Sequence, residues 1–312
     1  MNSHTEQIRA EARRLLESGE VSVVIGYAPG STPARATPVF VRKPEDAERL
    51  FWSPACAANL ALYVREQAAR GKVAVVAKGC DARSIVTLIQ EKQLRREDVH
   101  VIGVACSGVV DAGRLASAGV DEGKLKSLEA GGGALVADCG DGPAELQREA
   151  VLKRACLFCD TPVPPLWDVV VGEAAAPSPA PDGVLPEDLD ARREFWAEQF
   201  AKCVRCYACR QVCPACYCSE CFTDRLPVGW VSKRIAGPEN WMYHTTRAFH
   251  MAGRCVGCGE CERVCPAGIP IQTLMRRMAE EVDGLFGYRA GMDPDAEPVL
   301  ATYRDDDDGP AG

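Results

Sequence analysis

The strongest constraint on this chain is a cysteine pattern that occurs twice in its second half. In each copy, four cysteines are separated by two, two and three residues, and proline follows the fourth. The first copy runs from Cys203 to Pro214 and the second from Cys255 to Pro266. This spacing is typical of proteins that bind a pair of [4Fe-4S] clusters. Three thiolates on a short turn can reach three irons on one face of a cubane, and the fourth thiolate points toward the other cluster.

The pattern therefore predicts two [4Fe-4S] clusters with crossed ligation, each taking three cysteines from one copy and one from the other. The predicted ligands are Cys203, Cys206, Cys209 and Cys265 for cluster 1, and Cys255, Cys258, Cys261 and Cys213 for cluster 2. Structural zinc is the alternative interpretation. Zinc, however, normally takes four ligands as two separated pairs, which does not explain two runs of four cysteines.

Length and composition indicate a two-domain protein of a reducing compartment. A chain of 312 residues is long enough for two domains with separate cores. It lacks the roughly eighteen consecutive apolar residues that would span a bilayer, and its first nineteen residues are predicted to form an amphipathic helix, not a secretion signal. Seventeen cysteines at ligand spacings then indicate metal sites in a cytoplasmic protein. A net charge of -8 argues against nucleic acid as a partner.

The first half of the chain, residues 1–172, is predicted to be an α/β domain with a largely parallel sheet. Apolar runs that alternate with helical segments are typical of strands covered on both faces. The expected strands are residues 21–25, 73–77, 99–105 and, as a plausible fourth, 134–137. A loop and a helix over residues 82–94 are expected after the second of these strands.

The second half is predicted to be an α-helical domain that holds two [4Fe-4S] clusters, like the helical type of two-cluster ferredoxin. Residues 173–186 are rich in alanine and proline and are expected to be a linker. The helical domain then covers residues 187–290, and residues 291–312 form an acidic tail. One helix of this domain is expected to begin near residue 187, and two more are expected over residues 239–252 and 272–285.

A second set of cysteines lies in the α/β domain. Cys80 and Cys106 follow two predicted strands, so both are expected at the carboxyl edge of the sheet, where such folds bind ligands. Cys156 and Cys159 form a separate pair. These four thiols could hold a third [4Fe-4S] cluster, or Cys80 and Cys106 could simply be small buried residues. We expect Asp81 to cap the following helix and so to stabilise a thiolate at Cys80. Cys139 is the main competitor for a place in the set.

Three further cysteines, Cys216, Cys218 and Cys221, follow the first copy closely. They could be ligands of an additional cluster, with Cys56 or Cys139 as the fourth ligand. They could equally be ordinary thiols packed over cluster 2, and the irregular spacing favours this second interpretation. His244 and His250 are six residues apart, which suits buried or capping histidines better than metal ligands.

The first half resembles the beta subunits of coenzyme F420 (deazaflavin) hydrogenases and dehydrogenases. The resemblance covers roughly residues 70–172 and is carried by segments 78–81, 103–106, 156–160 and 167–172. It implies that Cys80, Cys106, Cys156 and Cys159 surround one [4Fe-4S] cluster with a flavin, such as FAD, beside it. Arg35, Lys78 and Arg83 could contact flavin phosphates, but the sequence contains no dinucleotide-binding fingerprint.

The second half resembles the two-cluster electron-transfer subunits of several anaerobic enzymes. Residues 213–218 are similar to the corresponding motif in sulfhydrogenases and anaerobic sulfite reductases, and residues 254–271 are similar to the two-cluster subunit of heterodisulfide reductases. The resemblance implies an electron relay that works inside a hetero-oligomeric complex with flavin- or metal-bearing partners.

These observations predict an iron-sulfur electron-transfer subunit of an anaerobic oxidoreductase complex of hydrogenase, formate dehydrogenase or heterodisulfide reductase type. No nucleophile with an adjacent base, and no carboxylate pair, indicates catalysis by the chain alone. The alternative is a catalytic subunit that binds flavin and oxidises or reduces a soluble carrier, either deazaflavin or a nicotinamide. A zinc-stabilised interaction module is a third interpretation.

Overall fold

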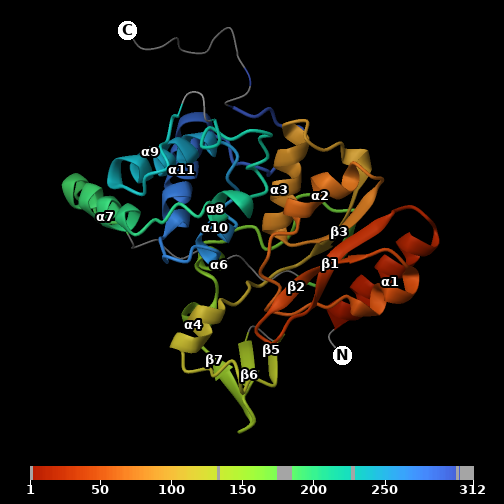
Figure 1. The fold of residues 1–312 in the computed structure, drawn as a ribbon. Coiled ribbons are helices and arrows are strands. Elements are labelled where there is room, and N and C mark those ends of the chain that lie inside the picture. The colour runs from red at the N-terminus through yellow and green to blue at the C-terminus, as the bar shows by residue number, and fades with distance from the viewer. Residues whose placement is uncertain (1–2, 132–133, 174–184, 226–228, 300–301, 303–312) are drawn as a thin grey trace.

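The computed structural model describes residues 3–131, 134–173, 185–225, 229–299 and 302. Its first half is built around a five-stranded sheet with the order β2-β1-β3-β4-β8 (Figure 1). The strands are β1 (Val23–Pro29), β2 (Ala36–Val41), β3 (Val73–Ala77), β4 (Val99–Val104) and β8 (Val169–Val171). The strands β1, β3, β4 and β8 run parallel, and β2 pairs antiparallel with β1 at the edge. The predicted α/β fold with a largely parallel sheet is therefore confirmed.

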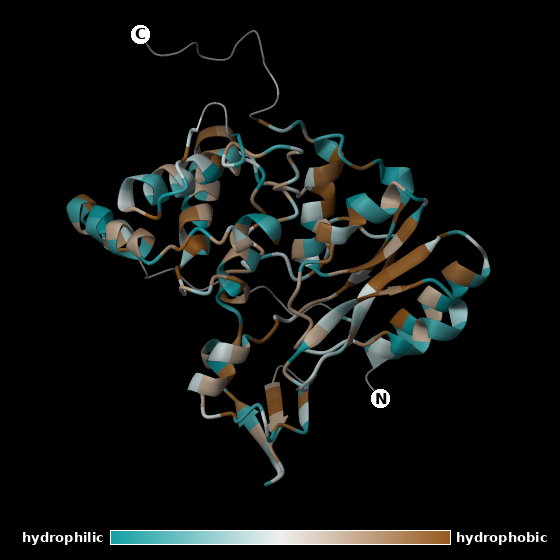
Figure 2. Ribbon diagram, viewed as in Figure 1, coloured by the Kyte–Doolittle hydropathy of each residue, from teal (hydrophilic) through white to brown (hydrophobic). Residues whose placement is uncertain are grey.

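Helices pack on both faces of this sheet. Helix α1 (Ser3–Glu17) lies on one side, and α2 (Ala61–Ala68) and α3 (Gly79–Gln90) lie on the other (Figure 1). Because both faces are covered, every residue of β3 and of β4 is buried. Figure 2 shows this as brown strands among helices whose colours are mixed. The short 3-10 helices η1 and η2 cover Pro44–Arg49 and Arg96–Asp98.

A small antiparallel sheet forms a separate layer (Figure 1). It contains β5 (Ser127–Gly131), β6 (Ala134–Asp138) and β7 (Pro143–Leu146), and it packs near α4 (Ala112–Ser117) and α5 (Arg148–Val151). The prediction that residues 134–137 form a fourth strand of the parallel sheet is wrong. The run is apolar throughout, but only alternate residues of β6 are buried, which is the pattern of a sheet with one covered face.

Short helices around the cysteine runs and longer helices behind them form the second half. They are α7 (Leu189–Ala201), α8 (Ala208–Gln211), α9 (Gly237–His250), α10 (Glu260–Arg263) and α11 (Ile271–Phe286), whereas the short α6 (Arg154–Leu157) precedes β8 and belongs to the α/β domain. The predicted helical segments are confirmed with small shifts of their ends. Cysteines of both copies pack with Tyr243, Met251 and Ile271 in a shared core. Among the described residues, no helix is long and apolar enough to cross a bilayer.

Two predicted segments lie largely outside the described residues. Most of the expected linker and the acid run of the expected tail, residues 305–308, fall there. The start of the expected tail is described and returns to the α/β domain. Gln90 of α3 donates hydrogen bonds to the carbonyl oxygens of Asp293 (2.7 Å) and Ala296 (3.0 Å), and it accepts one from Tyr288 Oη (3.0 Å). This segment therefore connects the end of α11 with α3.

Candidate metal centres

The first centre brings the three leading cysteines of the first copy together with the last cysteine of the second. All four thiols line one small cavity: Cys203, Cys206, Cys209 and Cys265. Burial raises the pKa of Cys203, and the neighbouring thiols of the same set raise it further. The Arg205 backbone N–H donates to Cys203 Sγ (3.3 Å), and Tyr243 Oη lies 3.2 Å from Cys209 Sγ. This is the set that the crossed-ligation prediction names.

The second predicted centre combines the leading cysteines of the second copy with Cys213. Burial raises the pKa of Cys261 well above its ordinary value. The Arg247 guanidinium opposes that shift, whereas the thiols of Cys255, Cys258 and Cys213 add to it. The charge of Cys213 thus reaches this set, and its own thiol contacts that of Cys216, so the crossed ligation of Cys213 stays a prediction.

The two copies fold their loops in the same way. In the first, Arg205 and Tyr207 have left-handed backbones, with φ of 46° and 59°. Gly257 and Gly259 occupy the same places in the second, with φ of 72° and 70°. This conformation suits glycine and is uncommon for other residues, so the first copy keeps its loop shape against an intrinsic backbone preference. Two left-handed residues therefore lie at the same positions in both copies, between the first and the third cysteine.

The third predicted set comes from separate elements of the α/β domain. Cys80 lies in the first turn of α3, and Cys106 follows β4. Cys156 belongs to α6, with Cys159 two residues beyond that helix. Burial raises the pKa of Cys106 to about 12, with further contributions from the nearby Cys156 and Cys159 thiols. Backbone N–H groups of Gly108 and Val109 donate to Cys106 Sγ and Cys156 Sγ, both at 3.4 Å. The fold thus gathers these cysteines at the carboxyl edge of the sheet.

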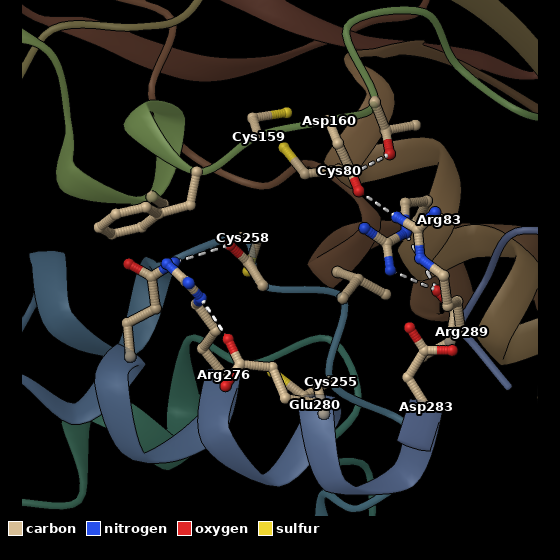
Figure 3. A pocket seen from close by; sticks show the side chains of 18 of the residues that line it. Cys80, Arg83, Cys159, Asp160, Cys255, Cys258, Arg276, Glu280, Asp283 and Arg289 are labelled. Atoms are coloured by element: carbon tan, nitrogen blue, oxygen red, sulfur yellow. Dashed lines mark hydrogen bonds and ion pairs between the residues drawn. The ribbon is translucent and has the colours of Figure 1, made fainter. Parts of the chain in front are cut away.

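The second and third sets face each other across a cavity of about 310 Å³. The cavity is lined from the α/β domain by Cys80, Cys156 and Cys159, and from the helical domain by Cys255 and Cys258. Figure 3 shows Cys80 and Cys159 on one side of this space and Cys258 on the other, above α11. Sequence spacing could not predict this juxtaposition, because it depends on how the two domains pack.

Asp81 is not the N-cap residue of α3 that the sequence predicted, but it caps the helix from the third helical position as part of a capping box. Helix α3 begins directly after β3, and Lys78 is its N-cap residue. Asp81 is buried inside the first turn, where its carboxylate accepts hydrogen bonds from the backbone N–H groups of Lys78 (2.8 Å) and Leu60 (3.0 Å) and pairs with Lys78 Nζ (2.8 Å). Burial, and then the Asp81 charge, raise the pKa of Cys80, so the expected stabilisation of a Cys80 thiolate is wrong.

The competing cysteines lie elsewhere. Cys56 is buried in the core of the α/β domain, where burial raises its pKa to about 12. Cys139 lies beside the small sheet, with its Sγ 4.0 Å from the Asp121 carbonyl oxygen. Neither lines the cavities of the three centres or the cavity that Cys216, Cys218 and Cys221 share.

The residues proposed for flavin phosphates are not gathered at one place. Arg35 pairs with Glu122 on the surface, and Lys78 is buried against Asp81 and Tyr27. Arg83 lines the cavity between the two domains, but its guanidinium donates to the Ala290 carbonyl oxygen (2.8 Å).

One buried and two more exposed ion pairs join the two domains. Lys153 of the α/β domain pairs with Glu260 of α10 at 2.6 Å. On the other side of the cysteines, Arg254 pairs with Glu91 (2.5 Å), and Arg289 pairs with Asp160 (Figure 3). These ion pairs thus hold the ligand cysteines of the two domains in place relative to one another.

Comparison with known proteins confirms the resemblance in both halves. Residues 70–185 match the family model for the C terminus of the coenzyme F420 hydrogenase/dehydrogenase beta subunit, and residues 199–269 match the model for a 4Fe-4S dicluster domain. The narrower likenesses to sulfhydrogenases, sulfite reductases and heterodisulfide reductases remain predictions.

Two curated relatives match along nearly their whole length. The F420-dependent formate dehydrogenase 1 subunit beta of Methanococcus maripaludis is 28% identical over 363 residues, covering 94% of this chain and 92% of the relative. The F420-dependent formate dehydrogenase subunit beta of Methanocaldococcus jannaschii is 22% identical over 360 residues, covering 95% and 94%. A chain of the F420-reducing [NiFe] hydrogenase complex from Methanosarcina barkeri aligns over 51% of this chain and 59% of its own, with 18% identity and a TM-score of 0.40. Residues 70–185 are therefore similar to the C terminus of coenzyme F420 hydrogenase/dehydrogenase beta subunits, residues 199–269 are similar to 4Fe-4S dicluster domains, and the two full-length relatives are beta subunits of F420-dependent formate dehydrogenases.

Proposed function

We propose that the chain is an iron-sulfur electron-transfer subunit of an oxidoreductase complex of the formate dehydrogenase type. The observation that carries this proposal is the cavity that cysteines of both domains share, because it brings the second and third ligand sets face to face. The relatives' names support the complex and its F420 dependence. A partner subunit would carry out the chemistry on the substrate. A reducing location such as the cytoplasm suits seventeen cysteines that are all free.

The proposed ligands are the three cysteine sets described above, giving clusters 1 and 2 and a third cluster at Cys80, Cys106, Cys156 and Cys159. When bound, such clusters supply one-electron redox chemistry. The chain contributes thiolates, backbone N–H donors to sulfur, and the buried cations Arg247 and Lys153 near the sulfurs. Tyr207 and Tyr243 pack edge to face beside the first set, and aromatic cover of this kind excludes water.

The alternative is a flavin-binding catalytic subunit, and the F420 dependence in the relatives' names is what favours it. A flavin with phosphates would need cationic donors in its site. The arginines that line the shared cavity already have partners within the protein. Arg83 donates to Ala290, Arg276 pairs with Glu280 (2.9 Å), and Arg289 pairs with Asp160. This arrangement favours the relay over a flavin site in that cavity.

The test is anaerobic purification of the chain, followed by quantitation of iron, sulfide and flavin and by two activity assays. The relay proposal predicts iron and sulfide in equal amounts, little flavin, and electron transfer to artificial dyes without preference for a natural carrier. Stoichiometric flavin together with rapid, specific reduction of F420 or a nicotinamide would instead establish the catalytic subunit.

A further inference from the structure

Cys216, Cys218 and Cys221 line a cavity of about 240 Å³ that borders the first two centres, since Tyr243 also lines the first cavity and the Cys216 thiol contacts the Cys213 thiol. Its other wall is the C-terminal end of α9, with His250 and Met251. The Cys216 and Met251 sulfurs lie 3.6 Å apart. Three thiols from one short segment therefore face a common space, which the irregular spacing of these cysteines did not predict.

Three arginines line the cavity, and one of them has no carboxylate partner among the described residues. Arg210 pairs with Asp224 and Arg254 pairs with Glu91, which leaves the charge of Arg247 uncompensated. Arg247 is only 4% exposed, and it donates to the Cys209 carbonyl oxygen (3.1 Å) through one terminal nitrogen. Its Nε is buried and has no hydrogen-bond partner within the described part of the chain. A buried N–H of a cation that lacks an acceptor is unfavourable, so the Arg247 side of the cavity suits an anionic occupant.

We propose that this cavity binds a further [4Fe-4S] cluster, held by Cys216, Cys218 and Cys221 with His250 as the fourth ligand. A cluster bound by three thiolates is anionic, and the Arg247 guanidinium would offset that charge. Two other lining groups are already engaged: Asp224 pairs with Arg210 (2.8 Å), and Tyr243 Oη lies against Cys209. An imidazole nitrogen is a suitable iron ligand, which leaves His250 as the fourth.

A single zinc ion fits the cavity less well. No three His, Cys, Asp or Glu side chains within the described residues could hold one metal ion together. The cysteines proposed for clusters 1 and 2 also do not meet at a single metal ion, because each thiolate of a [4Fe-4S] cluster binds a different iron. The segment lies next to the second centre, because the Cys216 backbone N–H donates to the Cys213 carbonyl oxygen (3.0 Å), while Cys218 is exposed. The site thus extends the proposed relay from the second centre toward the surface.

The test uses the full chain, reconstituted anaerobically, with iron counted per chain and clusters resolved by Mössbauer spectroscopy. A variant with Cys216→Ala, Cys218→Ala and Cys221→Ala should lose about four irons and one cluster and keep the other spectral components. Cys139→Ala is the matched control and should lose none. Because Cys218 is exposed and its replacement disturbs the core least, Cys218→Ala alone is the second variant, and it should lose part of the same component. Unchanged iron in both variants would overturn the proposal while leaving the relay function of the other sets intact.

The fourth ligand has its own test in the same preparation. His250→Ala should lose about one iron and give the electron paramagnetic resonance signal of a [3Fe-4S] cluster, whereas His250→Cys should keep all the iron with an altered signal. If neither variant changes the spectrum, His250 is not a ligand.

Discussion

Lys153 and Glu260 form a buried ion pair across the junction of the two domains, with 2.6 Å between Nζ and Oε1. Lys153 precedes the helix that holds Cys156, and Glu260 is the residue before Cys261. Glu260 is further held by Arg263 at 2.6 Å. The pair lies between the second and third ligand sets, so the contact that joins the domains also fixes the cysteines relative to one another.

Glu260→Gln should destabilise the junction strongly. It leaves the Lys153 ammonium buried without a counter-charge, and breaking a buried pair in this way costs about 3–5 kcal/mol. Thermal melting under anaerobic conditions measures the loss. Glu281→Gln breaks an exposed pair with Arg277 and should cost less than about 1 kcal/mol.

The double variant Lys153→Met, Glu260→Leu tests whether the loss of stability comes from the unpaired charge of Lys153 or from lost packing at the junction. It should recover most of the stability, since apolar replacements of a buried pair are often neutral. Equal melting temperatures for Glu260→Gln and Glu281→Gln would show that the buried pair does not hold the junction.

Crossed ligation predicts that each fourth cysteine serves the opposite copy. Cys213→Ala should damage the cluster of Cys255, Cys258 and Cys261, because the charge of Cys213 reaches that set. Cys265→Ala should damage the other cluster. Mössbauer spectra of the two single variants, each compared with a triple variant of the matching copy, give the assignment. If Cys213→Ala instead removes the component that depends on Cys203, the crossed assignment is wrong.

Gly259 and Gly257 form a matched pair for testing how closely the domains approach. Both have left-handed backbones, so an alanine at either position carries a similar strain of about 1 kcal/mol. A Cβ on Gly259 would lie 2.6 Å from Ala155 Cβ, whereas a Cβ on Gly257 would meet no atom within 4 Å. We expect Gly259→Ala to lower the melting temperature clearly more than Gly257→Ala does. Equal effects would mean that the junction tolerates an added methyl group.

The Asp168 carboxylate, which lies away from the cysteines, should stabilise the fold in a pH-dependent way. Burial alone would raise its pKa, but hydrogen bonds from Arg96 and the Val101 backbone N–H outweigh this, and the pKa is lowered. The carboxylate therefore stabilises the fold above the unfolded-state pKa of about 3.9, and the contribution is lost as pH falls through the lower folded-state value.

Asp168→Asn should accordingly cost about 1 kcal/mol at pH 7, a modest figure because the pair is partly exposed, and progressively less below pH 4. Urea unfolding of both proteins across this range measures the difference. Asp98→Asn, which removes the partner of the exposed Arg95, is the control and should change little. A difference that stays constant with pH would contradict the linkage to Asp168.

The sequence predicted the elements whose signals are local. The run at 73–77 is a strand with those bounds, because a covered parallel strand is apolar along its whole length. The same signal gave a wrong prediction at residues 134–137, because this apolar run belongs to an antiparallel sheet with only one covered face. Strand β2 was missed because it is a partly exposed edge strand with mixed residues.

The ligand sets also differ in how far the sequence predicts them. The cysteines of the two copies are predictable because their spacing within one turn defines the site. The proximity of Cys80 and Cys258 is not, since it depends on a junction made by residues such as Lys153 and Glu260, which carry no motif. The cavity at Cys216 likewise depends on where α9 ends relative to the first copy.

The central claim is that both domains contribute clusters around one shared cavity. The most direct measurement is the iron content of the anaerobically reconstituted full chain with Cys80→Ala and Cys159→Ala, compared with the unsubstituted protein and with Cys139→Ala. The account predicts a loss of about four irons per chain in the double variant, with the Mössbauer components of clusters 1 and 2 retained and no loss in the control. Unchanged iron in a folded double variant would show that the α/β domain holds no cluster at these cysteines, and the proposed relay between the domains would be wrong.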